Sequence, residues 1–241
     1  GPQGTRFGAN ALAGMINITS AAPTKDVSGY VAAKAGNYAS YGLGGAVSGS
    51  LSDSLQARIA VHGFESDGYM ENDFLNKDDT QNYDEKIARA KFSWQPNASG
   101  DVTLTMLYAD IDNGYDAFTF DNNRHTLSDE PGKDSQDTSA FSLAWNQDIN
   151  SALRFESTIS ASNSSAEYSY DEDWAYVGMH PDEYSSFDQY LRDFDRNSVD
   201  LRLLSGVDGR IFDDTTDWVI GVYSMTRGED MKRNYTYNAG Q

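Results

Sequence analysis

The sequence predicts an all-β protein, and within that class an antiparallel up-and-down transmembrane β-barrel. Three observations lead to this prediction. Apolar and polar residues alternate with period two in nearly every segment, short and long connections alternate strictly, and the excess negative charge lies in the long connections. We expect about nine strands of roughly 8–12 residues each.

Each strand is identified by apolar residues at every second position. Between residues 87 and 94, one face carries Ala88, Ala90, Phe92 and Trp94. The same pattern recurs at 55–64, 102–109, 141–146, 153–159, 199–203 and 218–223, and more weakly in the Gly- and Ala-rich stretches 29–35 and 41–50. A helical period is nearly absent, so the strands account for the fold class.

The connections between these strands differ in length. Short turns are expected at 49–54, 95–101 and 146–152, a moderate turn at 206–217, and long polar loops at 64–86, 110–138 and 166–197. In a meander every second connection lies at the same end, so all three long loops would project from one end. Short periplasmic turns with long extracellular loops are typical of a membrane barrel. A soluble β-sandwich is the alternative, since its strands alternate too.

The tryptophans agree with this polarity. Trp94 and Trp145 stand immediately before short turns, and Trp218 stands just after the moderate one. An aromatic girdle at a membrane interface would place them there. In the sandwich alternative they would be core anchors.

The charge lies in the loops. The chain has 241 residues, 18 Lys and Arg against 37 Asp and Glu, and a net charge of −19. The three long loops hold 25 of the acidic and 6 of the basic residues, so the rest of the chain is neutral. This acidity disfavours a nucleic-acid binder, and the absence of Cys excludes disulfides and thiolate metal sites. No stretch of about 20 apolar residues predicts a transmembrane helix.

Aromatic side chains in the same loops are suited to stack on a ligand at the mouth of a barrel. The candidate ligand-binding residues are Tyr69, Tyr115, Phe118, Phe120, Trp174 and Tyr176. The acidic surroundings favour a cationic, neutral or metal-bridged ligand over a strongly anionic one.

The sequence carries no catalytic or metal-binding pattern of the usual kinds. His62, His125 and His180 lack metal-ligand spacing, and no nucleophile motif occurs. The segment 110–116 is similar to a calcium loop, but its Gly comes one position early and the twelfth position lacks Glu, so the acidic exit of a strand is the favoured interpretation. We therefore expect neither enzyme activity nor a resident metal or cofactor.

The first 19 residues carry a specific motif. It comprises Gly1, Pro2, Gln3, Gly4, Thr5, Gly8, Asn10, Gly14 and Asn17, followed by an apolar β segment. This pattern resembles the segment that closes the plug domain of TonB-dependent outer-membrane receptors. Arg6 and Ala9 depart from the family pattern, which removes any basis for choosing a substrate subclass from the motif. The glycines would allow tight turns and close backbone approach in a compact plug.

The resemblance implies a 22-stranded barrel around a plug, in the outer membrane of a Gram-negative bacterium. Residues 1–23 would end the plug and residues 24–241 would begin the barrel, so we expect the chain to be a piece of a longer receptor. Its partners would be outer-membrane lipid, the TonB complex through a segment missing from this chain, and a small scarce ligand.

The commonest ligand in this family is an iron–siderophore complex, although cobalamin, haem and oligosaccharides remain open. A non-transporting module, adhesin-like or soluble, with cation- or partner-binding acidic loops is the alternative from another class.

Overall fold

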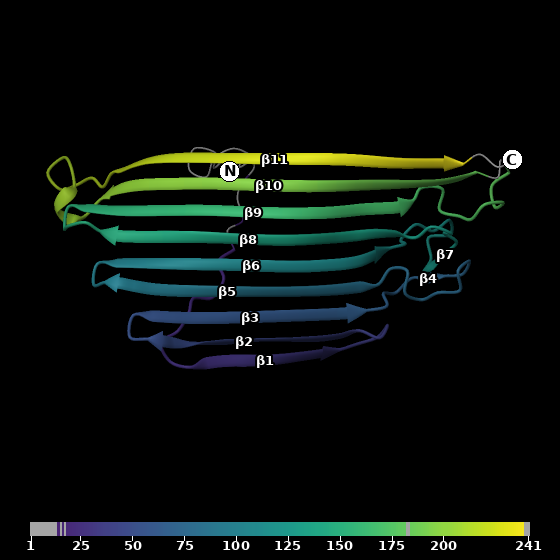
Figure 1. Cartoon of the computed structure of the whole chain (residues 1–241), viewed down its shortest axis with the longest axis horizontal. Coiled ribbons are helices and arrows are strands. Elements are labelled where there is room, and N and C mark those ends of the chain that lie inside the picture. The colour runs from purple at the N-terminus through teal and green to yellow at the C-terminus, as the bar shows by residue number, and fades with distance from the viewer. Residues whose placement is uncertain (1–13, 15, 17, 182–183, 239–241) are drawn as a thin grey trace.

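The computed structural model describes residues 14, 16, 18–181 and 184–238, and they form one nine-stranded antiparallel sheet (Figure 1). Each strand pairs with its neighbour in the chain, apart from two short strands in the loops. The sheet strands are β1 (Ser28–Ala35), β2 (Tyr41–Ser52), β3 (Leu55–Ser66), β5 (Tyr83–Asn97), β6 (Gly100–Tyr115), β8 (Gly132–Asp148), β9 (Leu153–Asp171), β10 (Ser185–Ser205) and β11 (Val219–Asn238). The loop strands are β4 (Glu71–Asn72) and β7 (His125–Thr126), and one 3-10 turn, η1, spans Val207–Gly209. The predicted all-β meander is confirmed.

The strands are longer than the sequence predicts. β9 has 19 residues and β10 has 21, so the long loops shrink to 67–82, 116–131 and 172–184. Many residues assigned to loops therefore belong to strand extensions. The prediction failed there because polar residues stand on both faces of an extension, including buried ones such as Asp171 and Asp188, so the polar–apolar alternation weakens while the backbone ladder continues.

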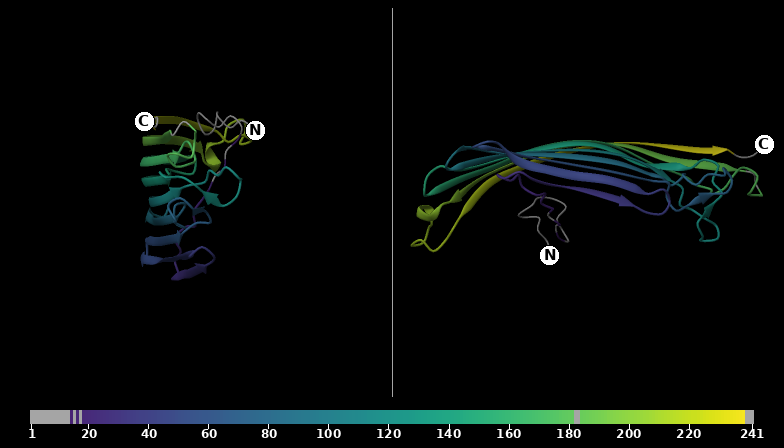
Figure 2. Two further views of the ribbon diagram at one scale, coloured as in Figure 1. Left: turned by 90° about the vertical axis from the view of Figure 1, so that its right-hand side faces the viewer. Right: turned by 90° about the horizontal axis from the view of Figure 1, so that it is seen from below.

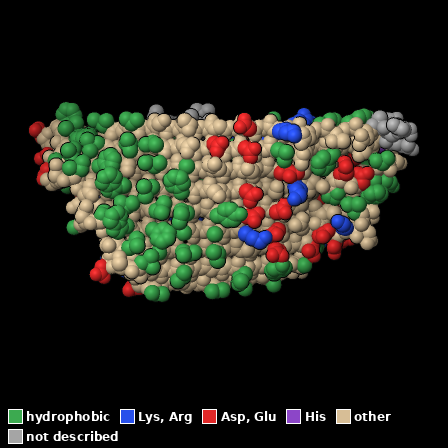
Figure 3. Space-filling view, viewed as in Figure 1, with side chains coloured by type: hydrophobic (Ala, Val, Ile, Leu, Met, Phe, Trp, Pro, Cys, Tyr) green, Lys and Arg blue, Asp and Glu red, His purple; other side chains and the backbone are tan. Residues whose placement is uncertain are grey.

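The convex face of the sheet carries an apolar band that ends at one row of the strand register. Ala88, Tyr108 and Ser139 lie side by side in the last row of the band, and the next row outward holds Lys86, Asp110 and Asp137. Figure 3 shows this change from apolar to charged side chains across the face. An outward apolar band bounded by polar residues is what a lipid-facing barrel wall requires.

The opposite, concave face meets the segment that precedes β1 (Figure 2). Lys91 Nζ on β5 donates a hydrogen bond to the Ser20 carbonyl at 3.0 Å. Among the described residues the only buried hydrophobic side chains are Met70 and Ala175, both in the loops. The described sheet therefore has no sandwich-like core, and its apolar band lies on the face opposite the segment before β1.

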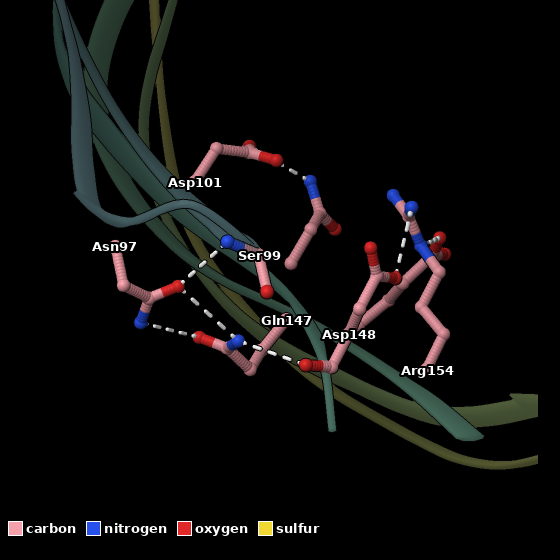
Figure 4. A network of polar contacts seen from close by, with 8 residues as sticks. Asn97, Ser99, Asp101, Gln147, Asp148 and Arg154 are labelled. Atoms are coloured by element: carbon pink, nitrogen blue, oxygen red, sulfur yellow. Dashed lines mark hydrogen bonds and ion pairs between the residues drawn. The ribbon is translucent and has the colours of Figure 1, made fainter. Parts of the chain in front are cut away.

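The short turns lie together at the other end of the sheet (Figure 1). There Asn97 Nδ2 donates to Gln147 Oε1 at 3.2 Å, and Arg154 pairs with Asp148 at 3.4 Å (Figure 4). The two nearby tryptophans of β5 and β8 are 48% and 43% exposed on the convex face. Trp218 is half-buried, and its Nε1 donates a hydrogen bond to the Gly209 carbonyl at 2.7 Å.

The amino-terminal motif falls mostly outside the described residues. Of its members only Gly14 is described; the others, Gly1, Pro2, Gln3, Gly4, Thr5, Gly8, Asn10 and Asn17, lie outside. The division between residues 23 and 24 stays a prediction, and β1 begins shortly after it.

Within the described part of the chain, no helix is long and apolar enough to cross a membrane.

Candidate functional site

The long loops pack into one unit at the end opposite the short turns. Strands β4 and β7 pair in parallel and join loop 67–82 to loop 116–131. Beneath them the buried Asp116 carboxylate accepts hydrogen bonds from Asn72 Nδ2 and Thr126 Oγ1, both at 2.8 Å. Because these groups are buried and mutually satisfied, they hold the two loops in one arrangement.

Loop 172–184 joins the same unit. Tyr176 stacks on Phe74 with ring centroids 4.5 Å apart and planes 6° apart. The Asp129 amide donates to the carbonyl of the fully buried Ala175 at 3.3 Å, and the Val177 amide donates to the Asp129 carboxylate at 3.2 Å. The three loops thus form a common scaffold for the side chains that face the concave side.

Seven aromatic side chains on that scaffold and the adjoining strand ends form what we call the aromatic wall. Its members are Tyr115, Phe118, Phe120, Tyr168, Tyr170, Trp174 and Tyr190. Phe118 lies at the centre, stacked on Trp174 with centroids 5.0 Å apart and planes 7° apart. It also meets the edges of Tyr115 at 5.8 Å and Tyr170 at 5.5 Å. Such stacked and edge-to-face contacts hold the rings in defined orientations and add stability beyond that from the burial of apolar area.

The backbone of Trp174 is unusual. Its φ is +64°, a left-handed conformation that bulky residues rarely adopt. The neighbouring Ala175 amide donates to the Asp173 carboxylate at 3.2 Å, which holds the turn in place. Strained conformations of this kind persist where the surroundings enforce them, and they gather at ligand sites. Trp174 remains 37% exposed, so part of its ring is available to a ligand.

A buried carboxylate anchors the tyrosines of the wall. Asp188 on β10 accepts hydrogen bonds from Tyr190 at 2.9 Å and Tyr170 at 3.3 Å, and from the Arg233 guanidinium through two contacts of 2.8 Å. The hydrogen bonds from Arg233 hold the pKa of Asp188 below its usual range, against the opposing effect of burial. The Arg233 guanidinium also lies over the Tyr190 ring, 5.2 Å from its centroid.

The aromatic wall borders a cavity of about 530 Å³ that is open to solvent. It is lined by Phe118, Tyr168, Tyr170, Glu172, Trp174, Tyr190 and Arg192. Arg192 and Arg196 are four residues apart on β10 and share a face, and Arg196 lines a second cavity with Ser20 of the segment before β1. The aromatic wall therefore lies on the concave face, which would be the lumen of a closed barrel.

Two carboxylates are buried behind Trp174 without a cationic partner among the described residues. Asp171 and Asp173 are 6% and 5% exposed, and each has one oxygen without a hydrogen bond. Burial, followed by a hydrogen bond with Asp173, raises the pKa of Asp171 to about 8. Such a pair carries a proton at neutral pH.

A metal centre does not emerge from the described residues. No group of three or more His, Asp or Glu side chains there is arranged to hold a metal ion. The segment 110–116, compared above with a calcium loop, belongs to β6 as far as Tyr115, so its side chains alternate between two faces instead of converging.

The six candidate ligand-binding residues separate into groups. The structure brings Tyr115, Phe118, Phe120 and Trp174 together in the aromatic wall. Tyr176 packs on the back of the loops against Phe74, and Tyr69 is 46% exposed, with no ring partner among the described residues.

Other members of the site were not predicted from the sequence. They are Tyr168, Tyr170, Tyr190, Arg192 and the anchor formed by Asp188 and Arg233. The signal was present as Tyr at alternate positions 168 and 170, followed by Tyr and Arg at 190 and 192, which is strand spacing inside a stretch assigned to a loop.

Comparisons with known proteins bear on the fold. No protein-family model matches the sequence. The ferric yersiniabactin uptake receptor FyuA from Yersinia pestis superposes over 99% of this chain and 36% of its own, with a TM-score of 0.79 and 20% identity. The chain has the fold of a TonB-dependent receptor barrel.

Two further structures, both of receptors from Pseudomonas aeruginosa, agree. FpvA bound to a heterologous pyoverdine and iron matches 90% of this chain and 29% of its own, with a TM-score of 0.63 and 16% identity. The ferripyoverdine receptor of the outer membrane, bound to ferripyoverdine, matches 89% and 29%, with a TM-score of 0.59 and 16% identity. The chain spans about a third of the length of these receptors.

Proposed function

We propose that the chain forms part of an outer-membrane TonB-dependent receptor that binds and imports an iron–siderophore complex. The observation that carries this proposal is the aromatic wall, which stands at the loop end of the barrel and faces the concave side. A ligand arriving from outside would meet it before the plug. The similar folds of receptors for ferric yersiniabactin and ferripyoverdine support the iron assignment.

Transport, not catalysis, is the proposed activity. FyuA is an uptake receptor and the Pseudomonas aeruginosa barrels are receptors for iron chelates, which supports transport. The energy for release of the ligand would come through the TonB complex. A non-transporting soluble module is the weaker candidate. In a soluble protein the exposed apolar band on the convex face, which ends sharply at one row of paired residues, would have no function.

Growth under iron limitation tests the proposal. A strain that lacks the full-length gene would be supplied in turn with defined siderophores as its sole iron source. We expect impaired growth on at least one siderophore, restored by the wild-type gene but not in a strain without TonB. Unimpaired growth on every siderophore would reject the iron assignment, and cobalamin, haem or an oligosaccharide would then be tested as the ligand.

A further inference from the structure

Four oxygen atoms behind Trp174 are buried without a hydrogen-bond partner among the described residues. They are Asp171 Oδ2, Asp173 Oδ2, Asp129 Oδ1 and the Ser128 hydroxyl oxygen. Buried polar atoms are almost always paired, and an unpaired carboxylate oxygen is costly to bury. Four such atoms in one part of the loop unit therefore indicate that a binding partner belongs there.

Backbone hydrogen bonds bring the four residues together. The Asp129 amide donates to the Ala175 carbonyl at 3.3 Å, so this part of loop 116–131 lies against the turn that follows β9. In that turn the Asp173 amide donates to Asp171 Oδ1 at 3.3 Å, and the Ala175 amide donates to Asp173 Oδ1 at 3.2 Å. Each aspartate thus holds the turn with one oxygen and leaves the other unpaired.

Ser128 adds a neutral oxygen to the carboxylates. Burial and Asp173 raise the pKa of Asp171, and the Ser128 hydroxyl acts in the opposite direction, which places this hydroxyl beside the Asp171 carboxyl. The Ser128 side chain is 2% exposed. Carboxylate and hydroxyl oxygens that face one another in this way are ligands for a hard cation.

No cationic side chain balances these carboxylates within the described part of the chain. The ion pairs there involve neither Asp129 nor Asp171 nor Asp173. His180 Nε2 contacts the Asp173 backbone carbonyl, at 3.1 Å. Buried carboxylates without a counter-charge either keep a proton or bind a cation.

We propose that Ser128, Asp129, Asp171 and Asp173 bind one calcium ion, which ties loop 116–131 to loop 172–184. All four donors are oxygens, whereas zinc and copper favour nitrogen and sulfur ligands. Donors from two loops suit the irregular coordination of Ca²⁺ better than the strict octahedron of Mg²⁺. Backbone carbonyls or water would complete the coordination shell. In the cation-free protein the aspartate pair carries a proton instead.

The proposed site differs in composition from a cluster of three acidic or His ligands. No such cluster occurs among the described residues, and here two buried aspartates share the ion with a hydroxyl and with the half-buried Asp129. The proposal revises the expectation, drawn from the sequence, that the chain has no resident metal. It goes beyond the proposed function, because it does not depend on which ligand the receptor imports.

Cation binding to the purified full-length receptor tests the inference. The receptor is first stripped with EDTA, and the probes are CaCl₂ and MgCl₂. We expect calorimetry to give a Ca²⁺ Kd of about 10⁻⁴–10⁻³ M, the range of extracellular calcium sites. Ca²⁺ at about ten times this Kd should slow hydrogen exchange of the Ala175 amide by about 10-fold, because it stabilises the closed turn.

Substitutions assign the ion to these residues. Asp171→Asn and Asp173→Asn each remove one charge and should weaken the Ca²⁺ Kd by about 10-fold or more, whereas Ser128→Ala keeps the charge and should weaken it less. Asp79→Asn is the matched control, because it removes the same charge from an exposed position in loop 67–82, and it should leave the Kd unchanged. Retention of the heat-modifiable barrel band on gels would show that each variant folds.

Two results would overturn the site. One is exchange of the Ala175 amide that does not respond to Ca²⁺ in the wild type, a measurement that needs no variant. The other is wild-type Ca²⁺ affinity in both Asp171→Asn and Asp173→Asn. An equal response to Mg²⁺ would overturn the assignment to calcium.

Discussion

Arg233 on β11 clamps Asp188 on β10 through two hydrogen bonds of 2.8 Å, one to each carboxylate oxygen. The Asp188 side chain is 2% exposed, while that of Arg233 is 51% exposed. The buried negative charge of Asp188 is therefore neutralised by a guanidinium that is half in contact with water. The hydroxyls of Tyr170 and Tyr190 also donate hydrogen bonds to this carboxylate.

Removing the arginine should loosen the aromatic wall. Arg233→Gln leaves the buried Asp188 without its cation, and we expect it to lower the local free energy of opening of β10 by about 1–3 kcal/mol. Asp188→Asn in the same chain should recover part of this loss, because the amide carries no charge. Hydrogen exchange of β10 amides measures both effects in a double-mutant cycle. Equal exchange in wild type and Arg233→Gln would show that the ion pair contributes nothing.

The buried carboxylates behind Trp174 should make the loop unit sensitive to pH. The pKa of Asp171 is about 8 in the folded protein against 3.8 for the free side chain. The folded state therefore holds a proton that the unfolded state releases, and the stability of the unit should fall as pH rises from about 4 to about 8.

Asp171→Asn should flatten this pH dependence. Hydrogen exchange of the Ala175 amide across that pH range, corrected for intrinsic rates, is the measurement. Asp79→Asn, which changes an exposed loop carboxylate, is the control and should keep the wild-type slope. A slope in Asp171→Asn as steep as in wild type would assign the effect to another group.

Close strand packing under the wall predicts intolerance of a side chain at Gly132. A Cβ there would overlap the Ser169 carbonyl, between the two wall tyrosines of β9. We expect Gly132→Ala to cost about 1–3 kcal/mol and to weaken ligand binding. Gly36→Ala, whose Cβ would meet only Ser40 at an ordinary 3.7 Å, is the control. Thermal unfolding and the ligand Kd of the two variants compare them directly.

The convex face should tolerate charge only beyond the apolar band. Leu143→Arg places a charge in the middle of the band and should cost about 2–4 kcal/mol, whereas Asp137→Arg beyond its edge should cost about 0–1 kcal/mol. Unfolding of the full-length receptor in lipid bilayers measures the difference. Similar costs at the two positions would argue against lipid on this face.

The strands are predictable from the sequence where their two faces meet different environments. Trp94 and Arg89 alternate because one face of β5 meets the apolar exterior and the other the polar interior. Beyond the apolar band the two faces no longer differ in this way. The strand extensions that carry Tyr168 and Tyr190 therefore have the sequence pattern of a polar loop.

The aromatic wall was predicted in part for the same reason. Phe118 and Trp174 stood out as aromatics in loops, but the contacts of Phe118 with Trp174 and with Tyr170 of β9 join segments that are distant in the chain. The clamp between Asp188 and Arg233, residues 45 apart, could not be inferred without the register of β10 and β11.

The orientation of the barrel is the central claim, because it places the aromatic wall outside the cell. The chain contains no Cys, so single cysteines can be introduced at Asn76 and Asp121 in the long loops and at Asp53 and Ser99 in the short turns. Labelling of intact cells with a membrane-impermeant maleimide is the most direct test. We expect the two loop positions to label in intact cells and the two turn positions only after permeabilisation. Labelling of the turns in intact cells, or equal labelling at both ends, would contradict the account.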